Sequence, residues 1–87
     1  MLDINYLIMK RVLLRDLKNE TIYIEIKGVL STIFFIEKAR VLVNRNRIVI
    51  ANENMDCTIL LGQVKSAKVE VGRVELITKD SKYILST

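Results

Sequence analysis

The sequence predicts a mainly β fold, α+β by element count, with an N-terminal helix packed on a compact antiparallel β-barrel or β-roll of seven to eight short strands. Residues 52–87 contain four short apolar runs separated by polar or glycine-containing breaks, which is typical of a β-meander. Residues 2–18 instead repeat apolar side chains at helical spacing. No connection between the expected strands is long enough for a helical crossover, so the strands should pair antiparallel. We therefore expect a single domain over residues 1–87, with a helix at 2–18 and an antiparallel β-meander at 21–87.

The expected helix carries a wide apolar stripe. Tyr6, Met9, Leu13 and Leu17 recur at steps of three and four, which places them on one face. Neighbouring leucine, isoleucine and valine residues widen this face on both sides. One side of the stripe should cover the sheet, and its other edge is a candidate surface for a partner.

The first expected strand is residues 21–27, in which apolar and polar side chains alternate. Ile22, Ile24 and Ile26 point to one face, as in a half-buried strand of high β-propensity. Residues 29–36 (Val-Leu-Ser-Thr-Ile-Phe-Phe-Ile) are apolar on both faces. This pattern predicts either a central strand or an edge strand that forms an interface, because such an edge left exposed would promote aggregation.

The remaining strands are separated by turn residues. Asn44-Arg45-Asn46 is an expected hairpin turn, since asparagine tolerates the positive φ of tight turns. Gly72-Arg73 is the expected turn of a later hairpin, which would place Glu70 opposite Glu75. Two facing carboxylates could bind a cation or a basic partner, but nearby cationic side chains could equally neutralise them. The strands expected in this part of the chain are 40–43, 47–51, 57–61, 64–71, 74–78 and 83–85.

The inventory of reactive side chains argues against catalysis. The chain has no histidine and one cysteine, Cys57, so it lacks the commonest general base and any Cys–His pair. Its three glycines are isolated and form no phosphate-binding loop. We therefore expect no enzyme activity, no catalytic residues, no cofactor and no metal site, and we expect Cys57 to be a small buried hydrophobic residue.

A cytoplasmic, intracellular location is expected, because one cysteine excludes an internal disulfide and no cleavable apolar leader is evident. Cationic side chains interrupt the N-terminal apolar stretch within the length that a membrane span requires. We therefore expect no transmembrane helix and do not favour a membrane partner. An interfacial helix on anionic lipid is the alternative that this segment leaves open.

The surplus of apolar residues favours a protein-interaction or assembly module that self-associates. Hydrophobic residues make up 51% of the chain, more than a monomer of this size can bury. The expected partners are further copies of the chain, in a homo-oligomer, or a larger protein assembly. The residues predicted to form the interface are Val29, Phe34, Phe35, Ile36, Tyr6 and Leu13.

A small-barrel nucleic-acid-binding protein is the alternative function. The net charge is +4, and the densest group of cations is Lys38, Arg40, Arg45 and Arg47, around the expected hairpin turn. Such a hairpin could contact phosphates. Single-strand binders also need aromatic stacking platforms. The candidates are Tyr23, Phe34, Phe35 and Tyr83, of which the two phenylalanines fit a core better.

Overall fold

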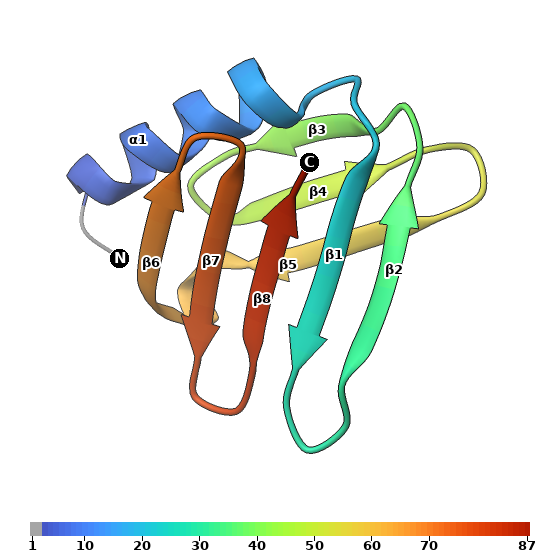
Figure 1. Cartoon of the computed structure of the whole chain (residues 1–87). Coiled ribbons are helices and arrows are strands. Elements are labelled where there is room, and N and C mark those ends of the chain that lie inside the picture. The colour runs from blue at the N-terminus through green and yellow to red at the C-terminus, as the bar shows by residue number, and fades with distance from the viewer. Residues whose placement is uncertain (1–2) are drawn as a thin grey trace.

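The computed structural model describes residues 3–87, with side chains from Tyr6 onward, and it confirms the predicted mainly β fold with an N-terminal helix (Figure 1). The expected helix position at residue 2 lies outside the described residues. The elements are α1 (Asp3–Val12), a π-helical turn η1 (Leu13–Leu17), β1 (Ile22–Lys27), β2 (Thr32–Ile36), β3 (Arg40–Val43), β4 (Arg47–Ala51), β5 (Asp56–Leu60), a 3₁₀ turn η2 (Leu61–Gln63), β6 (Val64–Glu70), β7 (Arg73–Thr78) and β8 (Lys82–Ser86).

The strands form two antiparallel sheets. One sheet has five strands in the order β2-β1-β8-β7-β6, and the other has three in the order β3-β4-β5. The chain therefore leaves the first sheet after β2, builds the second, and returns to complete the first. In Figure 1 the three-stranded sheet lies behind the five-stranded sheet, with its strands running across it. The predicted antiparallel pairing is confirmed, and the strands are divided between two sheets.

The helix closes one end of the space between the sheets. α1 packs against β6 and β7 of the larger sheet, and η1 packs against β3 of the smaller one. The helical segment ends at Asn19, which adopts the left-handed conformation with φ of 68°. The Asn19 N–H donates to the Ala39 carbonyl over 2.8 Å, and the Ala39 N–H donates to the Glu20 carbonyl over 3.0 Å. These two bonds fasten the end of the helix to the connection between β2 and β3.

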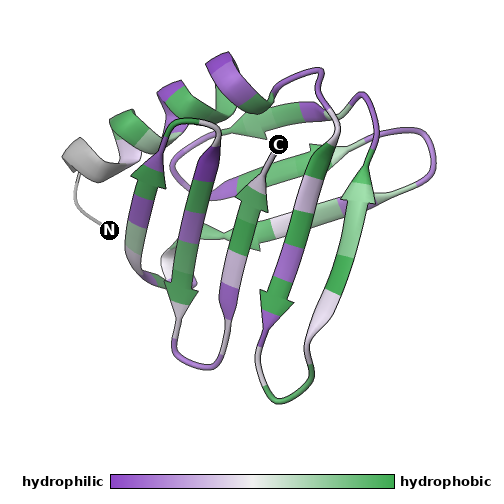
Figure 2. Cartoon of the chain, in the orientation of Figure 1, coloured by the Kyte–Doolittle hydropathy of each residue, from purple (hydrophilic) through white to green (hydrophobic). Residues whose placement is uncertain are grey.

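One apolar core joins the three layers. Figure 2 shows hydrophobic and hydrophilic residues alternating along β1, β6 and β7, as expected where one face of a sheet is buried. No polar side chain is buried among the described residues. The fully buried side chains include Met9, Leu13 and Leu17 from the helix, Ile22, Ile24, Val74, Leu76 and Leu85 from the five-stranded sheet, and Ile48 and Ile50 from the three-stranded sheet.

The stretch 29–36 is shorter as a strand than expected and lies at an edge. β2 begins at Thr32, and it pairs with β1 alone at the end of the five-stranded sheet. The sequence allowed a central strand or an edge strand for this stretch, and the structure places it at an edge. Phe34 lies opposite Ile24 and is half-buried, because it shares the inward face with Ile36.

The β6–β7 turn corrects a predicted register. The two turn residues are Val71 and Gly72, and Gly72 has a positive φ of 68°. Glu70 therefore lies opposite Arg73, and Glu75 lies opposite Lys68. The expected Glu70–Glu75 pair does not form, because the glycine occupies the second turn position, where the left-handed backbone is needed.

The burial of one helix face predicts that alanine substitution at Leu13 and at Leu7, six residues apart, changes the free energy of unfolding by very different amounts. Leu13→Ala should lower the free energy of unfolding by about 3 kcal/mol, because it leaves a cavity at a fully buried position. Leu7→Ala, at an exposed position of the same helix, should change it by less than about 0.5 kcal/mol. Urea unfolding followed by circular dichroism measures both. Equal losses would contradict the observed orientation of the helix.

Candidate protein-interaction edge

β2 has one hydrogen-bonded neighbour and one free side. Its register with β1 places Phe35 opposite Tyr23 and Ile33 opposite Glu25. Within residues 3–87, no strand pairs with its other side. A free edge of this kind presents backbone N–H and C=O groups that can pair with a further strand.

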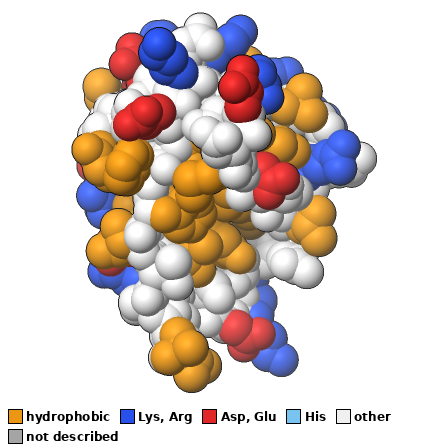
Figure 3. Space-filling view, turned by 90° about the vertical axis from the view of Figure 1, so that its right-hand side faces the viewer, with side chains coloured by type: hydrophobic (Ala, Val, Ile, Leu, Met, Phe, Trp, Pro, Cys, Tyr) orange, Lys and Arg blue, Asp and Glu red, His pale blue; other side chains and the backbone are white. Residues whose placement is uncertain are grey.

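The outward face of this edge is apolar. Ile33 is 70% exposed and Phe35 is 49% exposed, and the Tyr23 ring lies beside that of Phe35 with 5.9 Å between centroids. Tyr23, Ile33 and Phe35 are called the β2 patch below. At the tip of the β1–β2 connection, Val29 and Leu30 are almost entirely exposed. Figure 3 views the side of the molecule bordered by β2, and hydrophobic side chains gather in the middle of this face with charged side chains around them.

No feature of the β2 sequence protects the edge. Natural edge strands usually carry a lysine, a proline, an inward-pointing charge or a bulge that prevents pairing with other chains. Residues 28–36 contain neither a charged residue nor a proline. The nearest charges are Lys27 and Glu37, at either end of the segment. The sequence of β2 therefore places no charge or proline in the way of strand addition.

The predicted interface residues divide between surface and core. Val29 and Phe35 are exposed, and Phe34 is half-buried. Tyr6, Leu13 and Ile36 are buried within the chain itself, so the expectation that they meet a partner is corrected: they pack in the core.

Three surface residues of the edge were not predicted from the sequence as interface residues. Leu30 and Ile33 lay inside the predicted stretch, and strand alternation places Ile33 on the same face as Phe35. Tyr23 joins them through the β1–β2 register, which the sequence does not specify.

The four predicted basic residues are spread over the β2–β3 turn, the three-stranded sheet and the β3–β4 turn. Lys38 lies in the β2–β3 turn with a positive φ of 49°, and the Arg45 guanidinium lies 4.9 Å from the centroid of the Tyr6 ring. Arg40 and Arg47 are exposed on the three-stranded sheet, where Arg40 pairs with Ala51. Since Arg47 and Ala51 are four residues apart on β4, the two arginines are separated by about 14 Å along the strands.

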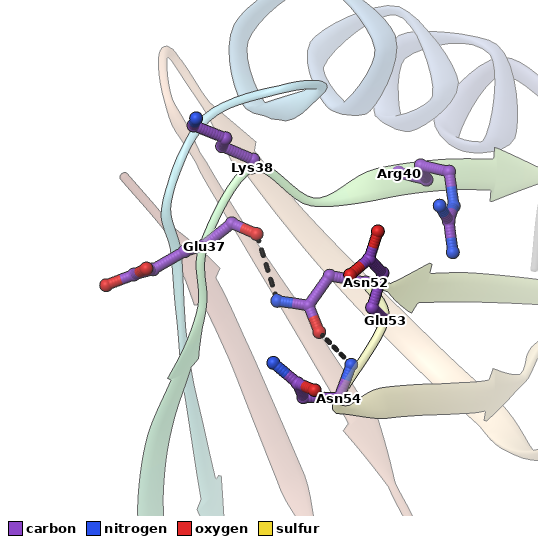
Figure 4. A pocket seen from close by; sticks show the side chains of 6 residues that line it. All are labelled: Glu37, Lys38, Arg40, Asn52, Glu53 and Asn54. Atoms are coloured by element: carbon purple, nitrogen blue, oxygen red, sulfur yellow. Dashed lines mark hydrogen bonds between the residues drawn. The ribbon is translucent and has the colours of Figure 1, made fainter.

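A polar cavity of about 360 Å³ lies beside the β4–β5 turn (Figure 4). The Asn52 amide donates to the Glu37 carbonyl over 3.0 Å, and its oxygen accepts from the Asn54 and Met55 N–H groups at 2.9 Å. These bonds stabilise the β4–β5 turn and connect it to the β2–β3 connection. They give Asn52 a structural role that explains its presence in the turn. The lining residues are Glu37, Lys38, Arg40, Asn52, Glu53 and Asn54.

Each carboxylate of the β6–β7 hairpin has a cationic partner. Lys68 lies 3.2 Å from Glu70, and Arg73 donates to Glu75 over 2.9 Å. Lys82 lies 3.5 Å from Glu75 on its other side. The hydrogen bond from Arg73 is the main cause of a lowered pKa for Glu75, to which the charge of Lys82 adds. The two glutamates are thus neutralised by their neighbours.

Asp16 connects the helix to the β6–β7 turn. Its carboxylate accepts from Arg15 over 2.7 Å and from the Gly72 N–H over 3.0 Å. The hydrogen bond from Arg15, and then that from Gly72, hold the pKa of Asp16 below its ordinary value.

Cys57 is buried, as predicted. Burial, and then the charge of Asp56, raise the pKa of the thiol. A raised pKa disfavours the reactive thiolate.

Searches of protein-family models, curated proteins and solved structures found no match to this chain. In the described part of the chain, no helix is long and apolar enough to cross a membrane. Over the same residues, no group of three or more histidine, cysteine, aspartate or glutamate side chains is placed to hold a metal ion.

The Asp16 contact predicts a pH-dependent signal at Gly72. Because the pKa of Asp16 is lowered by folding, its contribution to stability is present above the unfolded pKa and is lost as the pH falls through the folded one. In NMR spectra the Gly72 amide resonance should titrate with a midpoint below the ordinary aspartate value of about 3.9. Asp16→Asn should abolish this titration. Asp80→Asn, in the exposed β7–β8 turn, should leave the resonance unchanged. A Gly72 amide insensitive to Asp16→Asn would contradict the contact.

Proposed function

We propose that this chain is a non-catalytic protein-interaction module that self-associates by pairing β2 with β2 of a second copy. The observation that carries the proposal is a free, apolar edge strand with no charge or proline in residues 28–36. A two-fold axis would relate the copies and pair the strands antiparallel, so that both contribute the same surface. The two five-stranded sheets would then become one continuous sheet.

The side chains favour a register centred on Phe34. In that register Ile33 of each copy lies opposite Phe35 of the other, on the outward face of the sheet. Directly opposed aromatic and β-branched side chains stabilise a strand pair by about 0.2–1 kcal/mol each. Backbone hydrogen bonds between the edges supply further affinity, as in other cases of strand addition. The β2 patches of both copies would be buried together.

A larger protein assembly is the other expected form of this function. In that case a strand from a different protein would occupy the β2 edge, and the isolated chain would be monomeric. The self-associating form is preferred because the edge is self-complementary: its outward side chains are apolar, and no charge has to find an opposite charge.

The proposal predicts that Phe35→Glu converts a dimer into a folded monomer. Solution mass from light scattering should show a dimer of the parent chain at low and high salt, because apolar contacts are not screened. Placing a carboxylate from each copy in the interface should cost about 3 kcal/mol, or about 100-fold in Kd.

Leu42→Glu is the matched control. Leu42 is 53% exposed and lies on β3, an edge strand of the other sheet, so this variant should remain dimeric. Phe34→Glu is less informative because Phe34 packs against the core. A parent chain that stays monomeric at all concentrations would rule out self-association. A dimer that Leu42→Glu dissociates and Phe35→Glu does not would place the interface at β3 and contradict the proposal.

Nucleic-acid binding is the second candidate, favoured by the exposure of Arg40 and Arg47 on one face of the three-stranded sheet. It ranks second because the exposed aromatic residues Tyr23 and Phe35 belong to the other sheet.

This candidate predicts binding of a mixed-sequence single strand that weakens steeply with salt. The double variant Arg40→Ala, Arg47→Ala should reduce both the affinity and the salt dependence measured by fluorescence anisotropy. The double variant Lys65→Ala, Lys79→Ala is the control, because it removes the same number of positive charges at other positions. Absence of binding at low salt would exclude the activity.

A further inference from the structure

The N-terminal helix has a second apolar surface in addition to the one it buries. Tyr6, Met9 and Leu13 face the core, whereas Leu7, Ile8 and Leu14 point away from it and are 57%, 45% and 37% exposed. An ordinary surface helix places polar side chains at such outward positions. Three outward apolar side chains within two turns therefore need an explanation beyond folding.

Cationic side chains share this outer face. Arg11, Arg15 and Lys18 are exposed, and Lys10 is half-buried with its Nζ 6.0 Å from the centroid of the Tyr6 ring. Between Tyr6 and Lys18 the one acidic side chain is Asp16. Its carboxylate is already engaged by Arg15 and by the Gly72 N–H. The face is therefore both apolar and positively charged.

The β6–β7 turn extends the apolar part of this surface. The hydrogen bond from Gly72 to Asp16 holds the turn against the helix over 3.0 Å. Val71, the other turn residue, is 86% exposed. Figure 1 shows the helix along the top of the molecule with the β6–β7 turn beside it. Exposed apolar side chains from two elements thus lie at one end of the fold.

We infer that this end, called the helix face below, binds the surface of an anionic lipid bilayer. Basic amphipathic helices lie in the interface of such bilayers, with apolar side chains among the acyl chains and cations at the headgroups. The net positive charge of the helix face complements an anionic headgroup layer. A nucleic acid would satisfy the cations but leave Leu7, Ile8 and Leu14 in water. The binding is peripheral and requires no membrane-spanning segment.

The helix face is separate from the β2 edge. The helix packs against β6, β7 and β3, whereas β2 ends the opposite side of the five-stranded sheet. Bilayer binding therefore does not depend on the proposed self-association.

Co-sedimentation with vesicles tests the inference. The full chain should bind vesicles of phosphatidylcholine and phosphatidylserine in equal parts, and should bind pure phosphatidylcholine vesicles at least about tenfold more weakly. Arg11→Glu should weaken binding by about 25-fold, since each unit of charge near an anionic surface changes affinity about fivefold. Leu7→Gln should weaken it several-fold without altering the charge, because an inserted apolar side chain is lost.

Lys79→Glu is the control for the change of charge. Lys79 is exposed in the β7–β8 turn, at the other end of β7 from the helix, so this variant should bind within about threefold of the parent. Circular dichroism establishes that every variant is folded. The monomeric Phe35→Glu chain should keep its preference for phosphatidylserine, which separates this test from that of self-association.

Three results would overturn the inference. The first is no binding to phosphatidylserine vesicles at low salt. The second is binding that Arg11→Glu and Lys79→Glu weaken equally, because net charge alone would then explain it. The third is binding of mixed-sequence DNA, lost in Arg11→Glu, without vesicle binding, which would assign the helix face to a soluble polyanion.

Discussion

The fold depends on burying the inner face of the N-terminal helix between two sheets that share no strand pair. The sheets have five and three short strands, and no hydrogen-bonded ladder connects them. Met9, Leu13 and Leu17 are fully buried where α1 meets β6 and η1 meets β3. A chain of 87 residues buries only about two thirds of its unfolded surface, so it has little stability to spare. The buried face of the helix therefore joins the apolar faces of the two sheets into one core.

This arrangement leaves the sheet edges unequal. The helix packs against β6 and β3, which are edge strands of the two sheets. β2 and β5 are the edges on the other sides. On the exposed face of β5, Asp56 and Thr58 lie beside Leu60, which is 50% exposed, and the charge of Asp56 discourages pairing with a further strand. β2 is apolar from Ile33 to Ile36, and its one polar residue, Thr32, stands at its start. The position of the helix thus leaves β2 as an edge strand without a neighbour on its outer side among the described residues, and the sequence of β2 carries no charge that would oppose pairing there.

Local patterns in the sequence were sufficient for most elements. The alternation of Ile22, Ile24 and Ile26 identified β1 and its buried face, and the Asn44–Asn46 turn identified the β3–β4 hairpin. The β6–β7 turn was placed one residue too late, because a glycine can occupy either position of a two-residue turn and alternation does not choose between them. The change from α- to π-helical hydrogen bonding at Leu13 also has no local signature in the residues.

The candidate interface was harder to predict because residue type does not distinguish a core face from a binding face. Leu13 and Leu7 are the same residue on the same helix, yet the sheets cover one and not the other. Ile36 and Ile33 differ in the same way on β2. Which side is covered depends on long-range packing of the sheets against the helix, and the sequence specifies this only through the whole fold. The edge position of β2 is likewise non-local, since it depends on β8 pairing with β1 from the other side.

Two groups of exposed apolar side chains carry the two proposals, while Leu42, Met55, Leu60 and Ile77 are exposed elsewhere. Leu30, Ile33 and Phe35 surround the β2 edge, whereas Leu7 and Leu14 lie on the helix face. Charge separates them: residues 28–36 are uncharged, while the helix face is cationic. An uncharged apolar edge can pair with a copy of itself without electrostatic repulsion. Two copies of a cationic apolar face would repel each other, so such a face instead favours an anionic surface. In the two proposals, apolar side chains of the same kind would make two different kinds of contact, and the neighbouring charges would decide between them.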